Sequence, residues 1–360
     1  MSNSISAPSF LPDTAVLEVT GKCNHNCLFC SCPWFAPNNA VPEDLSTDEW
    51  KSIICEFAQN GVSRFSFSGG ECTLRPDFQE ILLFTSKLRI KTVCCKGNGI
   101  ASVERSPNIV VLSNGRNMSS SLLHFLKGID AHLSMSLPGL SSFPELTGTG
   151  LPAKNILHWF QEAASMGMQT TAAITVTHKN FFELYETIAT ALISGASTIL
   201  LNRYLPGGRG LLHDELRLNF EQVKQIPIIA EEVLRKAKHY GHLGTEYPRC
   251  VANPNDFKQL NVGARCAAAT GFFVIGPDGF IRVCNYSPKK LCHWSQWRIL
   301  IENPYWRRYI FHDNRPVECK GCSQYSKCDG GCRECAAAFT NDLCGRDPLF
   351  IKQPLKIEDE

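Results

Sequence analysis

Three cysteines near the N-terminus are the feature that most constrains this chain. Cys23, Cys27 and Cys30 are separated by three and then two residues, and they directly follow the apolar, strand-like run at 15–20. A cubane iron–sulfur cluster normally takes four thiolates, so three protein ligands on one loop would leave one iron open to bind another molecule. The alternative interpretations are a structural zinc site, which usually has four ligands, and a set of buried free thiols.

The other cysteines also favour metal over disulfides. The 360-residue chain has 18 cysteines, most of which gather at its two ends, in 23–32 and in 250–344. Disulfides belong mainly to secreted proteins, whereas clustered cysteines in cytosolic proteins more often bind metal. The sequence shows neither a signal peptide nor a membrane-spanning apolar run, so we expect a cytoplasmic protein without a membrane partner. A net charge of +2 gives no support for nucleic-acid binding.

Strand-like and helix-like stretches alternate along the first 200 residues. This alternation favours a parallel sheet, and the number of units predicts an α/β fold with a partial (β/α)6 TIM-like barrel. Ligands in such folds collect at the carboxyl ends of the strands. The cysteine loop, Gly69-Gly70-Glu71 and Ser113-Asn114-Gly115 all fall at such ends. We expect strands at about 15–20, 64–68, 109–112, 132–137, 170–176 and 197–201, and helices at about 47–58, 77–89, 122–126, 155–167, 181–195 and 219–241.

These residues resemble the radical S-adenosylmethionine (SAM) enzymes, whose CxxxCxΦC loop has an aromatic residue where this chain has Phe29. The resemblance implies that Cys23, Cys27 and Cys30 hold a 4Fe-4S cluster whose open iron chelates SAM. It also implies that Gly69, Gly70 and Glu71 contact the SAM amino group, and that Ser113-Asn114-Gly115 corresponds to the family's Thr-Asn-Gly. The cofactor-binding candidates are Phe29, Gly69, Gly70, Glu71, Asn114, Ser134, Ser136 and Arg203.

Three of these candidates have a plain structural alternative. Ser134 and Ser136 are candidates for ribose or carboxylate contacts, but they are equally well explained as ordinary strand serines. Arg203 and Arg209 follow the sixth strand and would lie at the mouth of the barrel, where they could hold a carboxylate of SAM or of a peptide. As an alternative, both are solvated loop arginines.

The C-terminal cysteines resemble the SPASM domain that is appended to radical SAM peptide maturases. A turn at Gly276-Pro277-Asp278-Gly279 separates two of them, and a Cx2Cx5Cx3C run and a final cysteine follow. The resemblance implies two auxiliary 4Fe-4S clusters, hence three clusters in all. Auxiliary cluster I would use Cys266, Cys284 and Cys332 with Cys250 as its fourth ligand, and auxiliary cluster II would use Cys319, Cys322, Cys328 and Cys344.

Two points in this ligand set stay open. Cys335 competes with Cys344 as the last ligand, and if Cys250 points elsewhere, auxiliary cluster I has an open iron that could bind substrate. A zinc ribbon is the alternative for the later cysteines. The predicted organisation is a flexible N-terminus (1–13), the partial barrel (14–215), a bridging helix (216–248), a Cys-rich SPASM iron–sulfur domain (249–350) and a tail (351–360).

The resemblance implies an oxidoreductase that generates a 5'-deoxyadenosyl radical and oxidatively cross-links a ribosomally synthesised peptide. The implied partners are the peptide or protein substrate and a flavodoxin- or ferredoxin-type electron donor. Either a separate leader-recognition protein binds the substrate's leader, or the barrel mouth alone holds the substrate. A formylglycine-generating enzyme or a small-molecule alcohol dehydrogenase is the enzymatic alternative, although Asn285 stands where the formylglycine enzymes have a basic Asp. An iron–sulfur electron carrier is the non-enzymatic alternative. No catalytic residue can be assigned from the sequence.

Overall fold

The computed structural model of the chain describes residues 10–96 and 99–350, and the side chains at 92–102 and 349 are outside that description. Most of the predicted flexible N-terminus and the whole predicted tail lie outside the described residues. In the described part, no helix combines the length and apolar character needed to cross a membrane.

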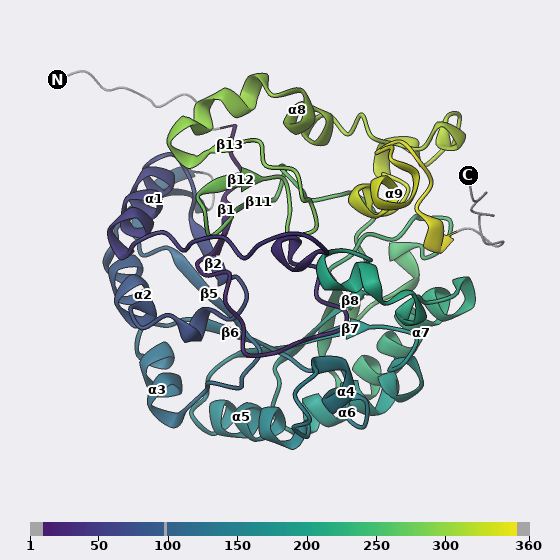
Figure 1. Cartoon of the computed structure of the whole chain (residues 1–360), viewed down its shortest axis with the longest axis horizontal. Coiled ribbons are helices and arrows are strands. Elements are labelled where there is room, and N and C mark those ends of the chain that lie inside the picture. The colour runs from purple at the N-terminus through teal and green to yellow at the C-terminus, as the bar shows by residue number, and fades with distance from the viewer. Residues whose placement is uncertain (1–9, 97–98, 351–360) are drawn as a thin grey trace.

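One large sheet organises the described chain (Figure 1). Its strand order is β10-β9-β8-β7-β6-β5-β2-β1-β11-β12-β13, and neighbouring strands from β10 through β11 are parallel. The strands are β1 (Thr14–Glu18), β2 (Arg64–Ser68), β5 (Asn108–Ser113), β6 (His132–Ser136), β7 (Thr170–Val176), β8 (Thr198–Arg203), β9 (Tyr240–Leu243), β10 (Leu260–Asn261), β11 (Phe272–Ile275), β12 (Phe280–Arg282) and β13 (Cys292–His293).

Helices connect the parallel strands and surround them (Figure 1). The six predicted strands are present as β1, β2, β5, β6, β7 and β8, so the predicted partial barrel is confirmed. The predicted bridging segment contains α7 and β9. The helices are α1 (Thr47–Gln59), α2 (Phe78–Lys87), α3 (Ser120–Gly128), α4 (Phe143–Thr147), α5 (Lys154–Ser165), α6 (Leu184–Ile193), α7 (Phe220–Ala237), α8 (Pro304–Ile310) and α9 (Arg333–Thr340).

Local sequence signals explain where the first helix begins and what it covers. The Ser46 hydroxyl accepts a hydrogen bond from Glu49 N and the Glu49 carboxylate accepts from Ser46 N, which is a capping box. Trp50, Ile54 and Phe57 on one face of α1 are fully buried against the sheet. An antiparallel hairpin, β3 (Ile90–Lys96) and β4 (Gly99–Arg105), is inserted before β5.

The Cys-rich C-terminal third is joined directly to the barrel sheet. β11 pairs with β1 in parallel, with Val16 opposite Val274, and β12 pairs antiparallel with β11. A buried ion pair between Glu18 of β1 and Arg282 of β12 adds a side-chain link. The N-terminal cysteines follow β1, and Cys284 follows β12. They are therefore attached to the same region of one sheet, in which β11 lies between β1 and β12.

Candidate functional site

The N-terminal cysteines lie on the loop that follows β1, called here the cysteine loop (residues 23–30). Two backbone hydrogen bonds attach this loop to the end of α4, from Asn26 N to Thr147 O (2.9 Å) and from Leu28 N to Leu146 O (3.0 Å). The loop therefore lies at the carboxyl edge of the parallel strands, where the alternation of strands and helices predicts a ligand site.

The thiols of the cysteine loop are close enough to affect one another. Burial raises the pKa of Cys27 above its usual range, and the neighbouring Cys30 and Cys23 thiols raise it further. Burial also raises the pKa of Cys23, with Cys30 among the further causes. Repulsion between poorly hydrated thiolates is relieved when a cation binds between them. The three side chains therefore fit the ligand set of an iron–sulfur cluster.

Arg209 supplies positive charge beside this loop. Its guanidinium donates a hydrogen bond to Cys27 O at 3.1 Å and stacks on Phe35, 4.7 Å from the ring centroid. Burial dominates the pKa of Cys27, and the Arg209 charge partly opposes that effect. The pKa of Cys30 is lowered, chiefly by a hydrogen bond with the Cys32 side chain and also by Arg209. Arg209 thus favours thiolates, which are the form that binds iron.

Gly69 and Gly70 let the loop after β2 lie against the segment that joins β1 to the cysteine loop. A Cβ on Gly69 would lie 2.3 Å from Thr20 O, and a Cβ on Gly70 would lie 2.2 Å from Lys22 O. Gly69 also has a φ of +133°, which favours glycine. Gly70 N donates to Thr20 O at 2.8 Å. The glycines therefore fix the loop beside the cysteines, and their contact with SAM stays a prediction.

Replacing Gly70 by alanine is expected to push this loop away from the cysteine loop, because the new methyl group would overlap backbone atoms. We expect a loss of stability of about 1–3 kcal/mol and weaker SAM binding, measured by thermal denaturation and equilibrium binding. Gly128→Ala is the matched control, because a Cβ there meets nothing within 4 Å. A Gly70→Ala protein that melts and binds SAM like the unmodified chain would contradict this view of the loop.

The Glu71 carboxylate is buried and satisfied within the protein. It accepts hydrogen bonds from the Thr73 hydroxyl (2.6 Å), the Ser113 hydroxyl (2.8 Å) and Asn114 N (2.6 Å). Burial raises the pKa of Glu71, and these hydrogen bonds oppose the rise. The carboxylate therefore joins the ends of β2 and β5. Its predicted contact with the amino group of SAM stays a prediction.

The other cofactor candidates surround the same edge of the sheet. The Asn114 side-chain nitrogen lies 3.8 Å from Cys23 Sγ. Ser134 is buried and Ser136 is half-buried on β6, which pairs with β5. Phe29 packs on a small buried cluster that includes Tyr204. These positions are compatible with the predicted SAM contacts, and the contacts themselves stay predictions.

Arg203 is directed away from the cysteine loop. Its side chain and that of Asp347 are both fully buried and form an ion pair, and its Nη1 lies 3.9 Å from Cys335 Sγ. Asp347 also accepts a hydrogen bond from Cys332 N at 2.9 Å. This geometry does not support the predicted contact of Arg203 with SAM. Arg203 instead links the end of β8 to the C-terminal segment, and Arg209 is the loop arginine beside the cysteine loop.

Four of the C-terminal cysteines form one group, called here the terminal group (Cys250, Cys319, Cys322 and Cys328). Arg249 N lies 3.5 Å from Cys328 Sγ. Loss of hydration raises the pKa of Cys250, and the Cys328 and Cys322 thiols raise it further. Burial is the largest cause that raises the pKa of Cys319, and the other three thiols of the group raise it further. Four neighbouring thiols fit a fully cysteine-ligated cluster.

The position of Cys250 corrects the predicted assignment of two ligands. The turn in which Val251 N donates to Pro248 O at 2.8 Å places Cys250 in the terminal group rather than beside Cys266. Cys344 has different neighbours: its Sγ lies 3.1 Å from Arg308 Nη2 and 3.6 Å from Asp313 O. Cys250, rather than Cys344, is therefore the fourth thiol beside Cys319, Cys322 and Cys328, and a cluster held there stays a prediction.

Three further cysteines form the hairpin group (Cys266, Cys284 and Cys332). Cys266 follows β10, Cys284 follows β12, and Cys332 precedes α9. Burial raises the pKa of Cys266, and Glu246, Cys332 and Cys284 raise it further. Burial likewise raises the pKa of Cys284, with Cys332 among the further causes. This grouping agrees with the predicted core of auxiliary cluster I, but its predicted fourth cysteine lies in the terminal group.

The cysteines whose side chains are described are all free thiols. Within the described residues, no three His, Cys, Asp or Glu side chains converge closely enough to hold a single metal ion. A cubane cluster is larger than one ion, so its ligands stand further apart than zinc ligands do.

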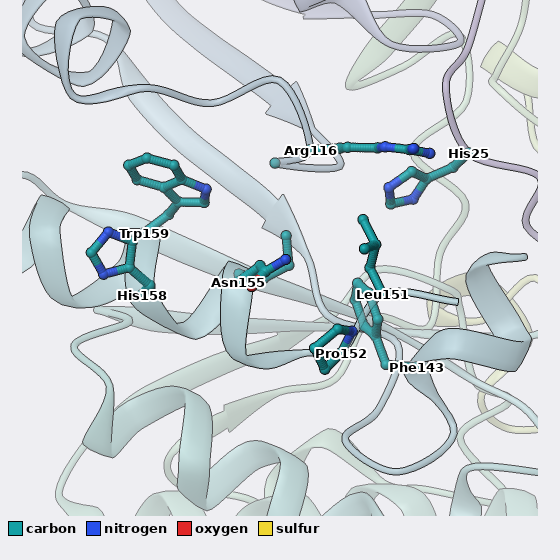
Figure 2. A pocket seen from close by; sticks show the side chains of 10 residues that line it. His25, Arg116, Phe143, Leu151, Pro152, Asn155, His158 and Trp159 are labelled. Carbon is teal, nitrogen blue, oxygen red and sulfur yellow. The ribbon is translucent and has the colours of Figure 1, made fainter. Parts of the chain in front are cut away.

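A cavity of about 250 Å³ opens beside the cysteine loop. Figure 2 shows His25 and Arg116 side by side at one wall and Trp159 and Asn155 of α5 at another. Burial lowers the pKa of His25 to about 4, and the Arg116 charge lowers it further. His25 is therefore neutral near pH 7.

A larger cavity of about 460 Å³ lies between the cysteine loop and the C-terminal third. Its lining is mainly apolar, and it includes Ser31, directly after the cysteine loop. Leu205 and Gly208 border it after β8, and Tyr286 and Cys335 border it from the C-terminal third.

Comparisons with known proteins agree with this architecture. Residues 17–191 match the family model of the Radical SAM superfamily. The chain is 24% identical over 237 residues to the sporulation killing factor maturation protein SkfB of Bacillus subtilis, covering 65% of this chain and 52% of that protein. It is 25% identical over 369 residues to the AdoMet-dependent heme synthase of Methanosarcina barkeri, covering 96% and 98%. It is 23% identical over 355 residues to the PqqA peptide cyclase of Granulibacter bethesdensis, covering 95% and 88%.

Two solved structures share the fold. Streptococcus suis SuiB bound to its precursor peptide SuiA has a TM-score of 0.70 at 14% identity, covering 94% of this chain and 75% of that one. The protein anSMEcpe with bound AdoMet also has a TM-score of 0.70, at 15% identity, covering 94% and 90%. The barrel, the cysteine loop and these matches define a radical SAM domain. Residues 17–191 therefore form the domain of a radical SAM enzyme, and the C-terminal cysteines are consistent with a SPASM domain.

Proposed function

We propose that this enzyme oxidatively cross-links a ribosomally synthesised peptide and uses SAM and three 4Fe-4S clusters to do so. The observation that carries the proposal is that the C-terminal third gathers a group of four thiols and a group of three thiols. Its β11–β12 hairpin belongs to the same sheet as β1, which leads into the cysteine loop. Relatives and structural neighbours named for peptide maturation or shown with a precursor peptide support the substrate class. An electron donor of the flavodoxin or ferredoxin type and a separate leader-recognition protein are the proposed partners.

The cysteine loop would hold the SAM-binding cluster through Cys23, Cys27 and Cys30. When bound, a cluster of this kind supplies the electron that splits SAM and yields a 5'-deoxyadenosyl radical. The chain's own residues orient the reactants and exclude water. Arg209 favours the thiolate forms of Cys27 and Cys30, which bind iron, and Gly70 positions the adjoining loop.

The cavity between the cysteine loop and the C-terminal third is the proposed substrate site. It is large and mainly apolar, as ligand sites usually are, and it is bordered by both Ser31 and Cys335. A peptide there would lie between the cysteine loop and the hairpin group. Such a position suits an oxidative cross-link, since the electron released from the substrate has an acceptor nearby.

A small-molecule substrate is the second candidate, because the relative that this chain covers almost completely is named a heme synthase. The formylglycine alternative is less well supported. Asn285 has no basic carboxylate, and its side-chain amide donates to Glu18 at 3.3 Å.

Anaerobic incubation with SAM and dithionite tests the proposal. We expect release of 5'-deoxyadenosine, and its absence from a protein with intact clusters would favour the electron-carrier alternative. Mass spectrometry of candidate peptides from neighbouring short genes then tests the substrate. A cross-link lowers the peptide mass by two hydrogen atoms without creating an aldehyde. An aldehyde at Ser or Cys, or conversion of a porphyrin but of no peptide, would reject the cross-linking proposal.

A further inference from the structure

We propose that the carboxylate of Glu246 is the fourth ligand of the cluster held by Cys266, Cys284 and Cys332. The hairpin group has lost its predicted fourth cysteine, since Cys250 lies in the terminal group. The inference rests on the proposed auxiliary clusters and is independent of the substrate.

Strand pairing brings Glu246 to Cys266. β9 and β10 are parallel neighbours, so the segments that follow them leave the sheet at the same edge. A hydrogen bond from Tyr247 N to Gly263 O (2.9 Å) holds these segments together beyond the strands. The Glu246 carboxylate then accepts from Ala267 N at 3.4 Å. It therefore lies at the backbone of the residue that directly follows Cys266.

Glu246 is half-buried, and its carboxylate lacks the cationic partner that two fully buried acids have. Asp347 pairs with Arg203, and Asp329 pairs with Arg315. Within residues 10–96 and 99–350, the Ala267 amide donates to Glu246, and no cation forms an ion pair with it. Loss of hydration without a cationic partner destabilises the charged form of an acid. A positive metal centre at this position would remove that destabilisation.

The thiols of the hairpin group respond to the same carboxylate. Burial is the largest cause of the raised pKa of Cys266, and Glu246 is the next largest. Burial is also the largest cause that raises the pKa of Cys332, to about 12, and Glu246 is again the next largest. The carboxylate therefore lies near two thiols that come from distant segments of the chain. Without metal, the negative charges of the carboxylate and the thiolates repel one another. Bound iron would attract all of them.

Cys335 is the competing fourth ligand. It lies on α9, three residues after Cys332. Burial raises the pKa of its thiol, and the Asp347 charge raises it further. Its Sγ contacts the Arg203 guanidinium at 3.9 Å. These contacts hold Cys335 at the buried ion pair, whereas the Glu246 carboxylate contacts the backbone directly after Cys266.

The test uses the full chain with Cys23→Ala, Cys27→Ala and Cys30→Ala, which leaves only the auxiliary sites. After anaerobic reconstitution and mild oxidation, iron per chain and the EPR spectrum are measured. Glu246→Ala is expected to lose one iron per chain and to show the signal of a three-iron cluster. Glu246→Cys is expected to keep all its iron and to show no such signal, because a thiolate replaces the carboxylate.

Glu334→Gln is the matched control. Glu334 also raises the pKa of Cys284, after burial, but its carboxylate is bound to the hydroxyls of Tyr305 (2.7 Å) and Tyr309 (2.6 Å). We expect its iron content and spectrum to be unchanged. The ligand assignment is overturned if Glu246→Ala keeps all its iron, if Glu246→Cys fails to restore it, or if Cys335→Ala shows the loss instead. A background protein without auxiliary iron would overturn the proposed clusters themselves.

Discussion

Cys27→Ala protein is expected to release at least about 100-fold less 5'-deoxyadenosine than the unmodified chain. Loss of a residue that only supports a metal ligand typically lowers metal affinity or activity by about 10–100-fold, and Cys27 would be a ligand itself. Cys27 is the most suitable position, since both Cys30 and Cys23 are close enough to raise the pKa of its thiol. The measurement is chromatography of anaerobic reactions with SAM and dithionite, together with the iron content of the protein.

Cys55→Ala is the control for that experiment. Cys55 is half-buried on α1, and partial burial alone raises the pKa of its thiol. We expect this variant to keep its iron and its rate of SAM cleavage. If Cys27→Ala cleaves SAM at an undiminished rate, the cysteine loop is not the site of the reaction.

Arg203→Met protein is expected to unfold with a free energy about 3–5 kcal/mol lower, because it leaves the buried Asp347 carboxylate without its cation. Removing the charge of Asp347 as well, in Arg203→Met/Asp347→Leu, should recover part of this loss. Recovery is incomplete because Cys332 N also loses its acceptor. Chemical denaturation of the three proteins measures both effects.

An exposed pair provides the comparison for Arg203. Lys236 and Glu232 form an ion pair on the surface of α7, and Lys236→Ala is expected to leave the denaturation midpoint nearly unchanged. If Arg203→Met costs less than about 1 kcal/mol, the upper range for an exposed pair, then the Arg203 pair does not hold the C-terminal segment.

The barrel could be predicted because its signals are local. The strands are short apolar runs followed by turn residues, and α1, α3 and α7 begin at residues whose side chains cap them, as the Ser46–Glu49 capping box shows. The cysteine loop and Gly69-Gly70-Glu71 could be found for the same reason. Their placement at one edge follows from the parallel order of the strands.

The ligand sets could not be fully predicted because they depend on long-range contacts. Cys250 joins Cys328 across 78 residues, and the direction of the turn at Pro248 decides which cysteines it meets. Glu246 was missed because its approach to Cys266 requires the pairing of β9 with β10. A buried-strand pattern after α7 is the signal that could have indicated it.

The two loop arginines show the same limit at shorter range. Arg203 is the last residue of β8, and strand geometry directs its side chain towards Asp347. Arg209 follows the turn at Gly207-Gly208 and returns to the cysteine loop. The sequence indicates that both lie near the barrel mouth, but it does not indicate which one turns inwards.

The direct pairing of β1 with β11 has a consequence for electron transfer. β1 leads into the loop that would carry the first redox centre, and the β11–β12 hairpin leads into a cysteine of the second. A hinge motion between the two would have to break sheet hydrogen bonds and separate Glu18 from Arg282. The electron-tunnelling distance between the two proposed centres would therefore be set during folding, and substrate would have to enter through the loops rather than by parting the two centres.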